Sequence, residues 1–358
     1  MKKYLLIPLL SIACLFSCTS GGQTDAVSIR IENPDFSNWS SLIAVDSIVP
    51  LEQTDSSLLS VASTFKVGKS KMLFSDYKAN NVYVFDRSGR FLFVAGGIGR
   101  SVSEHITVRD IGFSHDQTRI EILDERGIAV YDSDDGGFIE RKTIKDRMKN
   151  DYYSFLTMDN GYLLFTPHDD EYSVMRANGR NETEGIREKK SYGLAYKHFW
   201  GNADNALVLP DYGCYDIDGY ADGRLRAKYR LDFGGQSLPK SKIPLTSEEF
   251  DKVDAVNEYF KFISSAIETE DYLYVAAVGP AQTYYDIFYN KETGKTYSGK
   301  RDHTLGLVVV DADREFFYGL VYLDYMDETS QFYSHFKEYG VTDMKNPLLI
   351  KFHINDSL

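Results

Sequence analysis

Glycine-rich stretches are the first places in this sequence where chemistry could be sought, because a glycine loop can cradle a phosphate group. Residues 96–101 read GGIGRS after a strand-like run, but they lack the G-x-G-x-x-G spacing, and no helix is expected to follow them. Residues 67–70 read VGKS, like the end of a P-loop, yet Ser63 stands where the first glycine of that loop is required. A nucleotide site is therefore not expected.

Acidic clusters are the next candidates. Residues 168–171 read HDDE and gather four potential metal ligands, and residues 216–223 read DIDGYADG, similar to a calcium loop. The second stretch lacks the glutamate that closes an EF-hand, and Asp and Gly are also ordinary turn residues. The seven histidines show neither H-x-x-x-H nor H-E-x-x-H spacing, so no zinc centre is predicted. We expect no cofactor and leave a structural calcium ion open.

Nucleophiles and paired acids give no catalytic signature. The G-x-S-x-G elbow is absent, which excludes an α/β-hydrolase. Carboxylates are numerous, but a glycosidase-like pair cannot be chosen among them from sequence. The chain has 40 Lys and Arg against 53 Asp and Glu, a net charge of −13, which is a poor electrostatic match for a phosphate backbone. Nucleic acid is therefore not an expected partner.

The N-terminus resembles a bacterial export signal. Lys2 and Lys3 precede a short apolar stretch, and residues 15–18 read LFSC, which resembles the bacterial lipobox. We expect a signal peptide at 1–17, a lipid on Cys18 and a flexible tether at 18–36. The chain would then be anchored to the outer membrane, with the periplasmic and surface faces both open. Only Cys214 would remain elsewhere in the mature chain, so no intramolecular disulfide is expected.

Short apolar runs separated by turn residues recur through the rest of the chain, which is an all-β signature. Six of these runs end at Ser75, Leu123, Thr166, Leu209, Val278 and Leu323. Their spacings are 48, 43, 43, 69 and 45 residues, and each run is followed by a polar loop and a second apolar run. A repeat of roughly 40–50 residues with four strands is typical of a propeller blade, so the fold class predicted over 37–358 is a six-bladed β-propeller.

The long gap and the chain ends complete this prediction. Residues 246–249 read TSEE, a capping box, and begin a short helical insertion between the fourth and fifth blades. A second helix is expected at 331–339, stopped by Gly340. The last blade lacks an outermost strand, and the spare run at 42–51 is expected to supply it by lying beside 348–354. Such closure removes exposed sheet edges.

A family resemblance rests on three stretches: SIVPLEQTDSSLL near residue 50, VYVFDRSGRFLF near residue 87 and NPLLIKFHI near the C-terminus. Together they resemble the six-bladed β-propeller lipoproteins of Bacteroidetes, relatives of NHL-repeat propellers. The chain departs from that family's glycine-rich stretch at 96–104, where Arg100 and Glu104 occupy the family's Arg and Glu places. The resemblance implies a fold and a location.

Propeller geometry then predicts where a ligand would bind. In each blade the loop after the second strand lies on the same face as the connectors between blades, and these loops carry acids, arginines and tyrosines. The predicted ligand-binding residues on this face are Asp76, Lys78, Arg100, Arg109, Asp124, Arg126, His168, Asp211, Tyr212 and Tyr284. We expect a lipid-anchored propeller that binds a glycan, a peptide or a protein partner there. A hydrolase or lyase in the central funnel, and a scaffold subunit of an outer-membrane uptake complex, remain alternatives.

Overall fold

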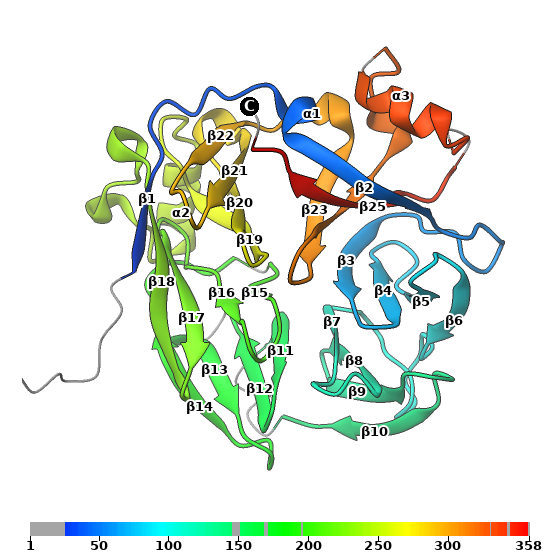
Figure 1. Ribbon diagram of the computed structural model, residues 1–358. Helices are drawn as coiled ribbons and strands as arrows, with labels where there is room; N and C mark the ends of the chain where they lie inside the picture. The colour runs from blue at the N-terminus through cyan, green and yellow to red at the C-terminus, as the bar shows by residue number, and fades with distance from the viewer. Residues whose placement is uncertain are drawn as a thin grey trace, which may run out of the picture.

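Six β-sheets are arranged radially around one axis in the computed structural model, which describes residues 26–144, 151–167, 171–194, 196–329, 331–341 and 344–356 (Figure 1). The predicted six-bladed β-propeller is therefore confirmed. Blade 1 contains β3 (Ala62–Val67), β4 (Lys71–Asp76), β5 (Val82–Asp86) and β6 (Phe91–Ala95). Blade 2 contains β7 (Asp110–Phe113), β8 (Arg119–Asp124), β9 (Gly127–Asp132) and β10 (Phe138–Lys142). Blade 3 contains β11 (Ser154–Met158), β12 (Gly161–Phe165), β13 (Tyr172–Ala177) and β14 (Thr183–Glu188).

The second half of the chain forms the other three blades. Blade 4 contains β15 (Phe199–Trp200), β16 (Leu207–Val208), β17 (Asp216–Ala221) and β18 (Arg224–Asp232). Blade 5 contains β19 (Phe262–Glu268), β20 (Tyr272–Val278), β21 (Tyr284–Asn290) and β22 (Thr296–Lys300). Blade 6 contains β23 (Leu307–Ala312), β24 (Phe317–Val321), β25 (Leu348–Ile354) and β2 (Ile43–Pro50).

Ring closure follows the expected route. The N-terminal β2 pairs antiparallel with β25, in a register from Ile43–Ile354 to Pro50–Leu348, and so becomes the outermost strand of blade 6. The innermost strands contact one another in cyclic order from β3 through β7, β11, β15, β19 and β23 back to β3. Because the last blade is built from both ends of the propeller domain, the ring is tied shut by backbone hydrogen bonds.

Burial between blades explains the apolar runs. All seven residues of β20 are buried, because the middle of a blade is covered by a neighbouring blade on each face. Aromatic rings fill the space between blades 5 and 6, where Phe288 and Phe317 have centroids 5.6 Å apart, and Phe317 and Phe352 lie at the same separation. The aromatic residues of this chain therefore serve mainly as packing between sheets.

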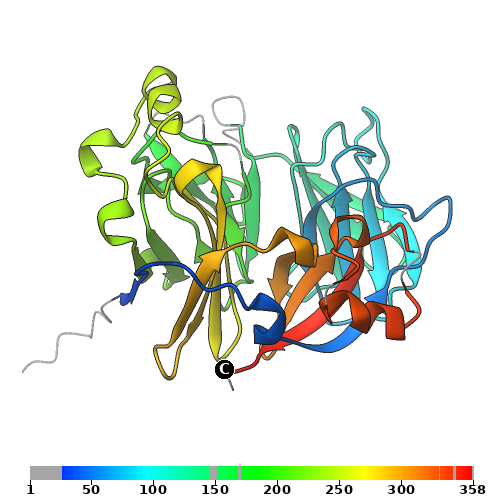
Figure 2. The same ribbon diagram turned by 90° about the horizontal axis from the view of Figure 1, so that it is seen from above.

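The helical insertion is present between blades 4 and 5. Helix α2 (Ser247–Asp254) begins at Thr246, whose side chain accepts a hydrogen bond from the Glu249 backbone N–H at 3.3 Å. The Glu249 carboxylate reaches back to the backbone N–H of Leu245 at 2.8 Å. Two 3₁₀ turns, η1 (Gly234–Gln236) and η2 (Lys240–Lys242), precede this helix. Figure 2 shows the insertion, in yellow-green, standing above one face of the ring.

Three further helical turns and two α-helices lie elsewhere. Helix α3 (Gln331–Glu338) is followed by Gly340 with a φ of +67°, as the sequence predicts. The short α1 (Trp39–Leu42), which leads into β2, was not anticipated. The 3₁₀ turns η3 (Pro280–Gln282), η4 (His303–Leu305) and η5 (Leu323–Tyr325) lie in blades 5 and 6. Among the described residues, no helix is long and apolar enough to cross a membrane.

Part of the expected tether is ordered on the propeller. Residues assigned to it include β1 (Val27–Arg30), which pairs parallel with β18 and adds a fifth strand to blade 4. The physical cause is the alternation of apolar residues: Ile29 and Ile31 are both buried against the core. Phe36 continues the contact, with its ring 4.8 Å from that of Trp39. Cys18 and the signal peptide expected at 1–17 lie outside the described residues.

Candidate functional site

Each blade repeats the same antiparallel connectivity, so the loops after the second strands and the connectors between blades emerge on one face, here called the connector face. The loops within the other two hairpins of each blade emerge on the opposite face, here called the hairpin face. The predicted ligand-binding residues belong to the connector face. His168 lies outside the described residues, and the other nine can be placed.

Asp76 has a structural role at the end of β4. Its buried carboxylate accepts hydrogen bonds from the backbone N–H groups of Lys78 and Ala79, each at 2.8 Å, and from those of Ser60 and Val61. These four donors occupy both carboxylate oxygens, so Asp76 fixes its own loop. The side chain of Lys78 is exposed to solvent.

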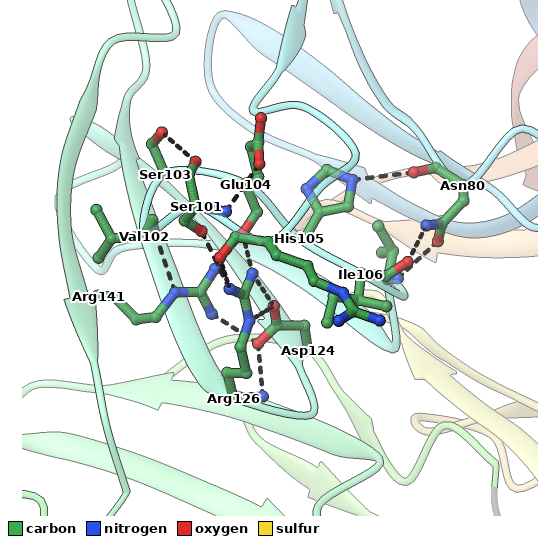
Figure 3. A network of polar contacts seen from close by, with 12 residues as sticks. Asn80, Ser101, Val102, Ser103, Glu104, His105, Ile106, Asp124, Arg126 and Arg141 are labelled. Atoms are coloured by element: carbon green, nitrogen blue, oxygen red, sulfur yellow. Dashed lines mark hydrogen bonds and ion pairs between the residues drawn. The ribbon is translucent and has the colours of Figure 1, made fainter.

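Asp124 lies at the centre of a network that holds the connector between blades 1 and 2 (Figure 3). Its carboxylate is buried and accepts from Arg141 Nη1 at 2.6 Å and from Arg126 Nη2 at 3.2 Å. Arg126 also donates to the carbonyl oxygens of Arg100 and Ser101, each at 3.0 Å. The two guanidinium groups therefore connect one buried acid to the backbone of residues 100–104.

The remaining side chains of this connector are arranged around the same network. Arg100 contributes its carbonyl oxygen, while its side chain is exposed. Glu104 accepts a hydrogen bond from the backbone N–H of Ser101 at 2.8 Å, and this bond lowers the pKa of its carboxyl. His105 Nε2 donates a hydrogen bond to the Asn80 carbonyl oxygen at 2.9 Å. The stretch that differs from the resembled family is thus a braced loop.

Three other predicted residues pack against neighbours. Arg109 lies 4.7 Å above the ring of Tyr153 and donates to the Tyr152 carbonyl oxygen at 2.9 Å. Tyr284 lies beneath the guanidinium of Arg301 at 5.0 Å. Tyr212 is buried, and its ring lies 5.1 Å from that of Phe250 in helix α2. Tyr212 therefore anchors the helical insertion onto blade 4.

A cavity of about 1100 Å³ lies on the connector face beside Asp211, the last of the nine predicted residues that can be placed. It is bounded by the end of β14, the loop 210–215, the strands β17 and β18, and residues 237–243 of the insertion. We call it the blade 4 cavity. Its charged lining residues are Arg187, Lys190, Asp211, Asp216, Asp218, Arg230 and Lys240. Its apolar lining includes Leu231, Leu238, Pro239 and Ile243.

Arg187 forms the buried centre of this cavity. Its guanidinium donates to Asp211 Oδ1 at 2.9 Å, to the Leu209 carbonyl oxygen at 2.8 Å and to Ser173 Oγ at 3.1 Å. It also lies 3.5 Å from Asp218 Oδ2. Burial raises the pKa of Asp218, and the charge of Arg187 only partly offsets this effect. Sequence reasoning missed Arg187, because nothing in its local sequence distinguishes it from an exposed strand residue, and it considered Asp218 only as part of the calcium-loop-like stretch 216–223.

His198 packs between Phe165 and the guanidinium of Arg187. Its ring stacks on Phe165 at a centroid distance of 3.8 Å, and its Nε2 contacts Arg187 Nη2. Burial and the adjacent guanidinium hold the pKa of His198 well below its usual range, so the imidazole is neutral. The neutral ring therefore accepts a hydrogen bond from Arg187 without cancelling its charge. The positive charge of the guanidinium is balanced only by Asp211 and Asp218 among the described residues.

The rim of the cavity is polar. Asp216 and Arg230 form an exposed ion pair at 2.8 Å. Lys190 and Lys240 are exposed, and neither ammonium lies within 4 Å of a carboxylate in the part of the chain that the structure describes. Gly213, with a φ of +74°, lets the insertion approach, since a Cβ atom there would lie 2.8 Å from Leu238 Cδ2. The rim thus offers two unpaired cations beside an apolar wall.

Cys214 lines the same cavity as a free thiol. Burial raises its pKa to about 11, and the negative charge of Asp211 acts in the same direction. The thiol is therefore protonated at neutral pH and is a poor nucleophile. The DIDGYADG stretch forms β17 and the turn into β18, and within the described residues no three His, Cys, Asp or Glu side chains are placed to share a metal ion.

Comparison with known proteins identifies the fold and the family. A crystal structure of a candidate exported protein from Bacteroides fragilis superposes with a TM-score of 0.76 at 15% sequence identity, covering 92% of this chain and 100% of that chain. A member of the DUF4221 family from Bacteroides vulgatus superposes with a TM-score of 0.60 at 12% identity, covering 89% of this chain and 100% of that chain. None of the curated proteins matches this sequence. Residues 26–352 match the family described as "Domain of unknown function (DUF4934)", and because this match spans all six blades, the chain belongs to that family.

Proposed function

We propose that this protein is an exported, lipid-anchored binding protein that holds a short peptide by its free carboxylate in the blade 4 cavity. The observation that carries the proposal is a cavity of about 1100 Å³ with an apolar wall and, at its rim, two lysines that form no ion pair with any described carboxylate. A volume of this size suits a small organic ligand, and such sites combine apolar walls with a few fixed polar groups.

The polar groups of the cavity match the carboxylate and the N–H groups of a peptide. Lys190 and Lys240 can attract a carboxylate. Asp216 and Asp218 lie on the strand side of the cavity and can accept from peptide N–H groups. Leu238 and Ile243 can cover an apolar side chain, which favours a peptide over a glycan.

Isothermal titration calorimetry can test this proposal with synthetic tripeptides that have an apolar central residue. We expect the free carboxylate form to bind at least tenfold more tightly than its C-terminal amide. The double variant Lys190→Ala/Lys240→Ala should bind both forms equally weakly. Lys337→Ala, which removes an exposed lysine of α3, is the matched control and should behave as the wild type. Equal affinity of the wild type for acid and amide would refute the proposal.

The anchor is tested separately. The sequence LFSC at 15–18 supports lipidation of Cys18, and β1 begins at Val27, so the eight residues 19–26 would lie between the lipid-bearing residue and β1. Metabolic labelling with a palmitate analogue should mark the wild type in a bacterial host. Cys18→Ser should lose the label and leave the membrane fraction, while Cys214→Ser should keep both. Labelling of the Cys18→Ser variant would contradict the anchor.

A further inference from the structure

The innermost strands of the propeller place four charged side chains around the central channel. Two are acids, Asp110 in β7 and Asp311 in β23. Two are lysines, Lys66 in β3 and Lys197 just before β15. None of the four belongs to the blade 4 cavity, and none was singled out in the sequence. Their hydrogen bonds determine which charges in the channel remain uncompensated.

Both acids accept hydrogen bonds from a neighbouring blade. Asp110 Oδ2 accepts from Ser154 Oγ at 2.7 Å and from the Phe155 N–H at 3.0 Å, which ties blade 2 to blade 3. Asp311 Oδ2 accepts from the Val67 N–H at 2.8 Å, which ties blade 6 to blade 1. These carboxylates therefore hold inner strands together and form no ion pair with a lysine among the described residues.

The two lysines approach the same segment of blade 4. Lys66 is only 9% exposed and crosses the channel from blade 1, with its Nζ 3.5 Å from the Gly201 carbonyl oxygen. Lys197 Nζ lies 4.2 Å from the centre of the Trp200 ring. Trp200 Nε1 is buried and has no hydrogen-bond partner within the described part of the chain. The two ammonium groups therefore both lie beside residues 200–201, where the charge of Lys66 acts on that of Lys197.

A cavity of about 220 Å³ opens on the hairpin face and reaches Lys66 and Gly201. Lys66 and Asp311 line its inner part, and the loops at 114–117 and 201–205 form its mouth. Phe113, Phe155 and Ile267 contribute apolar walls. Since a charge between apolar walls is poorly solvated, an unpaired ammonium at this depth is costly, and a bound anion would offset that cost.

We propose that the central channel binds a small oxoanion, such as sulfate or a short carboxylate, between the ammonium groups of Lys66 and Lys197. The anion enters from the hairpin face and accepts hydrogen bonds from both ammonium groups. This site is independent of the blade 4 cavity, because the two cavities share no lining residue and open on opposite faces.

Binding at this site is coupled to a proton. Burial and the charge of Lys66 together lower the pKa of Lys197 to about 7, against the opposite effect of Asp110 and Asp311. An anion stabilises the charged form, so the pKa of Lys197 rises on binding and a proton is taken up near neutral pH. Affinity should therefore fall as the pH rises above 7. The other charged groups at the cavity are Lys69, His115, Asp204 and Glu268, all on its lining.

Calorimetric titration with sodium sulfate at constant ionic strength tests the proposal, because sulfate does not change its charge between pH 6 and 9. We expect binding at least tenfold tighter at pH 6 than at pH 9, with proton uptake seen as a dependence on buffer ionisation heat. Lys66→Met and Lys197→Met should each weaken binding at pH 6 at least tenfold. Lys197→Met should also remove the pH dependence between 7 and 9. Lys337→Met is the matched control and should bind as the wild type does.

Thermal unfolding tests whether a variant loses sulfate binding only because it is less well folded. Sulfate stabilises most proteins weakly through exclusion from their surface, so the relevant quantity is the difference between the wild type and Lys66→Met at equal salt. We expect a larger rise in melting temperature for the wild type. The double variant Lys190→Ala/Lys240→Ala should keep the sulfate site. Loss of sulfate binding in that double variant, equal binding by all variants, or no binding to the wild type would each overturn the channel site.

Discussion

Ile43 pairs with Ile354 in blade 6, and the backbone N–H of Asn355 donates to the Leu42 carbonyl oxygen at 2.8 Å. The first and last long strands of the propeller are therefore one structural unit. Leu42 itself is completely buried beneath this junction. The stability of the whole ring thus depends on residues that lie at the two ends of the propeller domain.

Leu42→Ala should lower the free energy of unfolding by about 2–5 kcal/mol, because it leaves a cavity at the closing blade. Urea unfolding followed by tryptophan fluorescence measures this change. Val61→Ala is the control, since Val61 is 38% exposed and its truncation should cost under about 0.5 kcal/mol. A loss at Leu42 no larger than at Val61 would show that ring closure contributes little to stability.

Asp124→Asn should destabilise the protein by about 3–5 kcal/mol, because it leaves the buried guanidinium of Arg141 without its anion. Asp134→Asn removes an acid whose side chain is 88% exposed and pairs with Lys71, so its cost should stay below about 1 kcal/mol. Hydrogen exchange of residues 96–109 provides a local readout and should speed up only in Asp124→Asn. Unchanged exchange there would contradict the bracing role of the Asp124 network.

Gly213→Ala should loosen the insertion over the blade 4 cavity. A φ of +74° disfavours alanine, and the new Cβ atom would press against Leu238, so we expect a cost of about 1 kcal/mol or more. Hydrogen exchange of residues 237–243 should increase. Gly235→Ala is the matched control, because a Cβ atom at Gly235 meets no atom within 4 Å. Equal exchange in the two variants would argue against close packing at Gly213.

Alkylation of Cys214 by iodoacetamide should be slow at pH 8 and should accelerate close to tenfold per pH unit up to about pH 10. The reason is its pKa of about 11, which leaves roughly one thiol in a thousand ionised at pH 8. Mass spectrometry of the native protein follows the rate, and the urea-unfolded protein is the control, with the ordinary pH dependence of a cysteine. A native rate equal to the unfolded rate at pH 8 would show that the thiol is not desolvated.

The sequence by itself determined the architecture. Strands in the middle of a blade are buried on both faces, so they appear as continuous apolar runs, and six such runs at regular spacing predict six blades. The capping box at Thr246 is equally local, since its hydrogen bonds join residues within one helical turn. The spare run at 42–51 predicted the closing strand, because a last blade without an outer strand needs a partner from elsewhere.

The tertiary structure alone decided which polar side chains meet. Arg187 and Asp218 both lie where the strand register shifts, at irregularities in the β13–β14 and β17–β18 pairings. A bulge moves the following side chains to the other face of a strand, so alternation in the sequence cannot tell which of them point into the blade 4 cavity. Lys66 contacts Gly201 because the closed ring places blades 1 and 4 on opposite sides of the channel. The two residues are far apart in the sequence, so no local pattern could predict this contact.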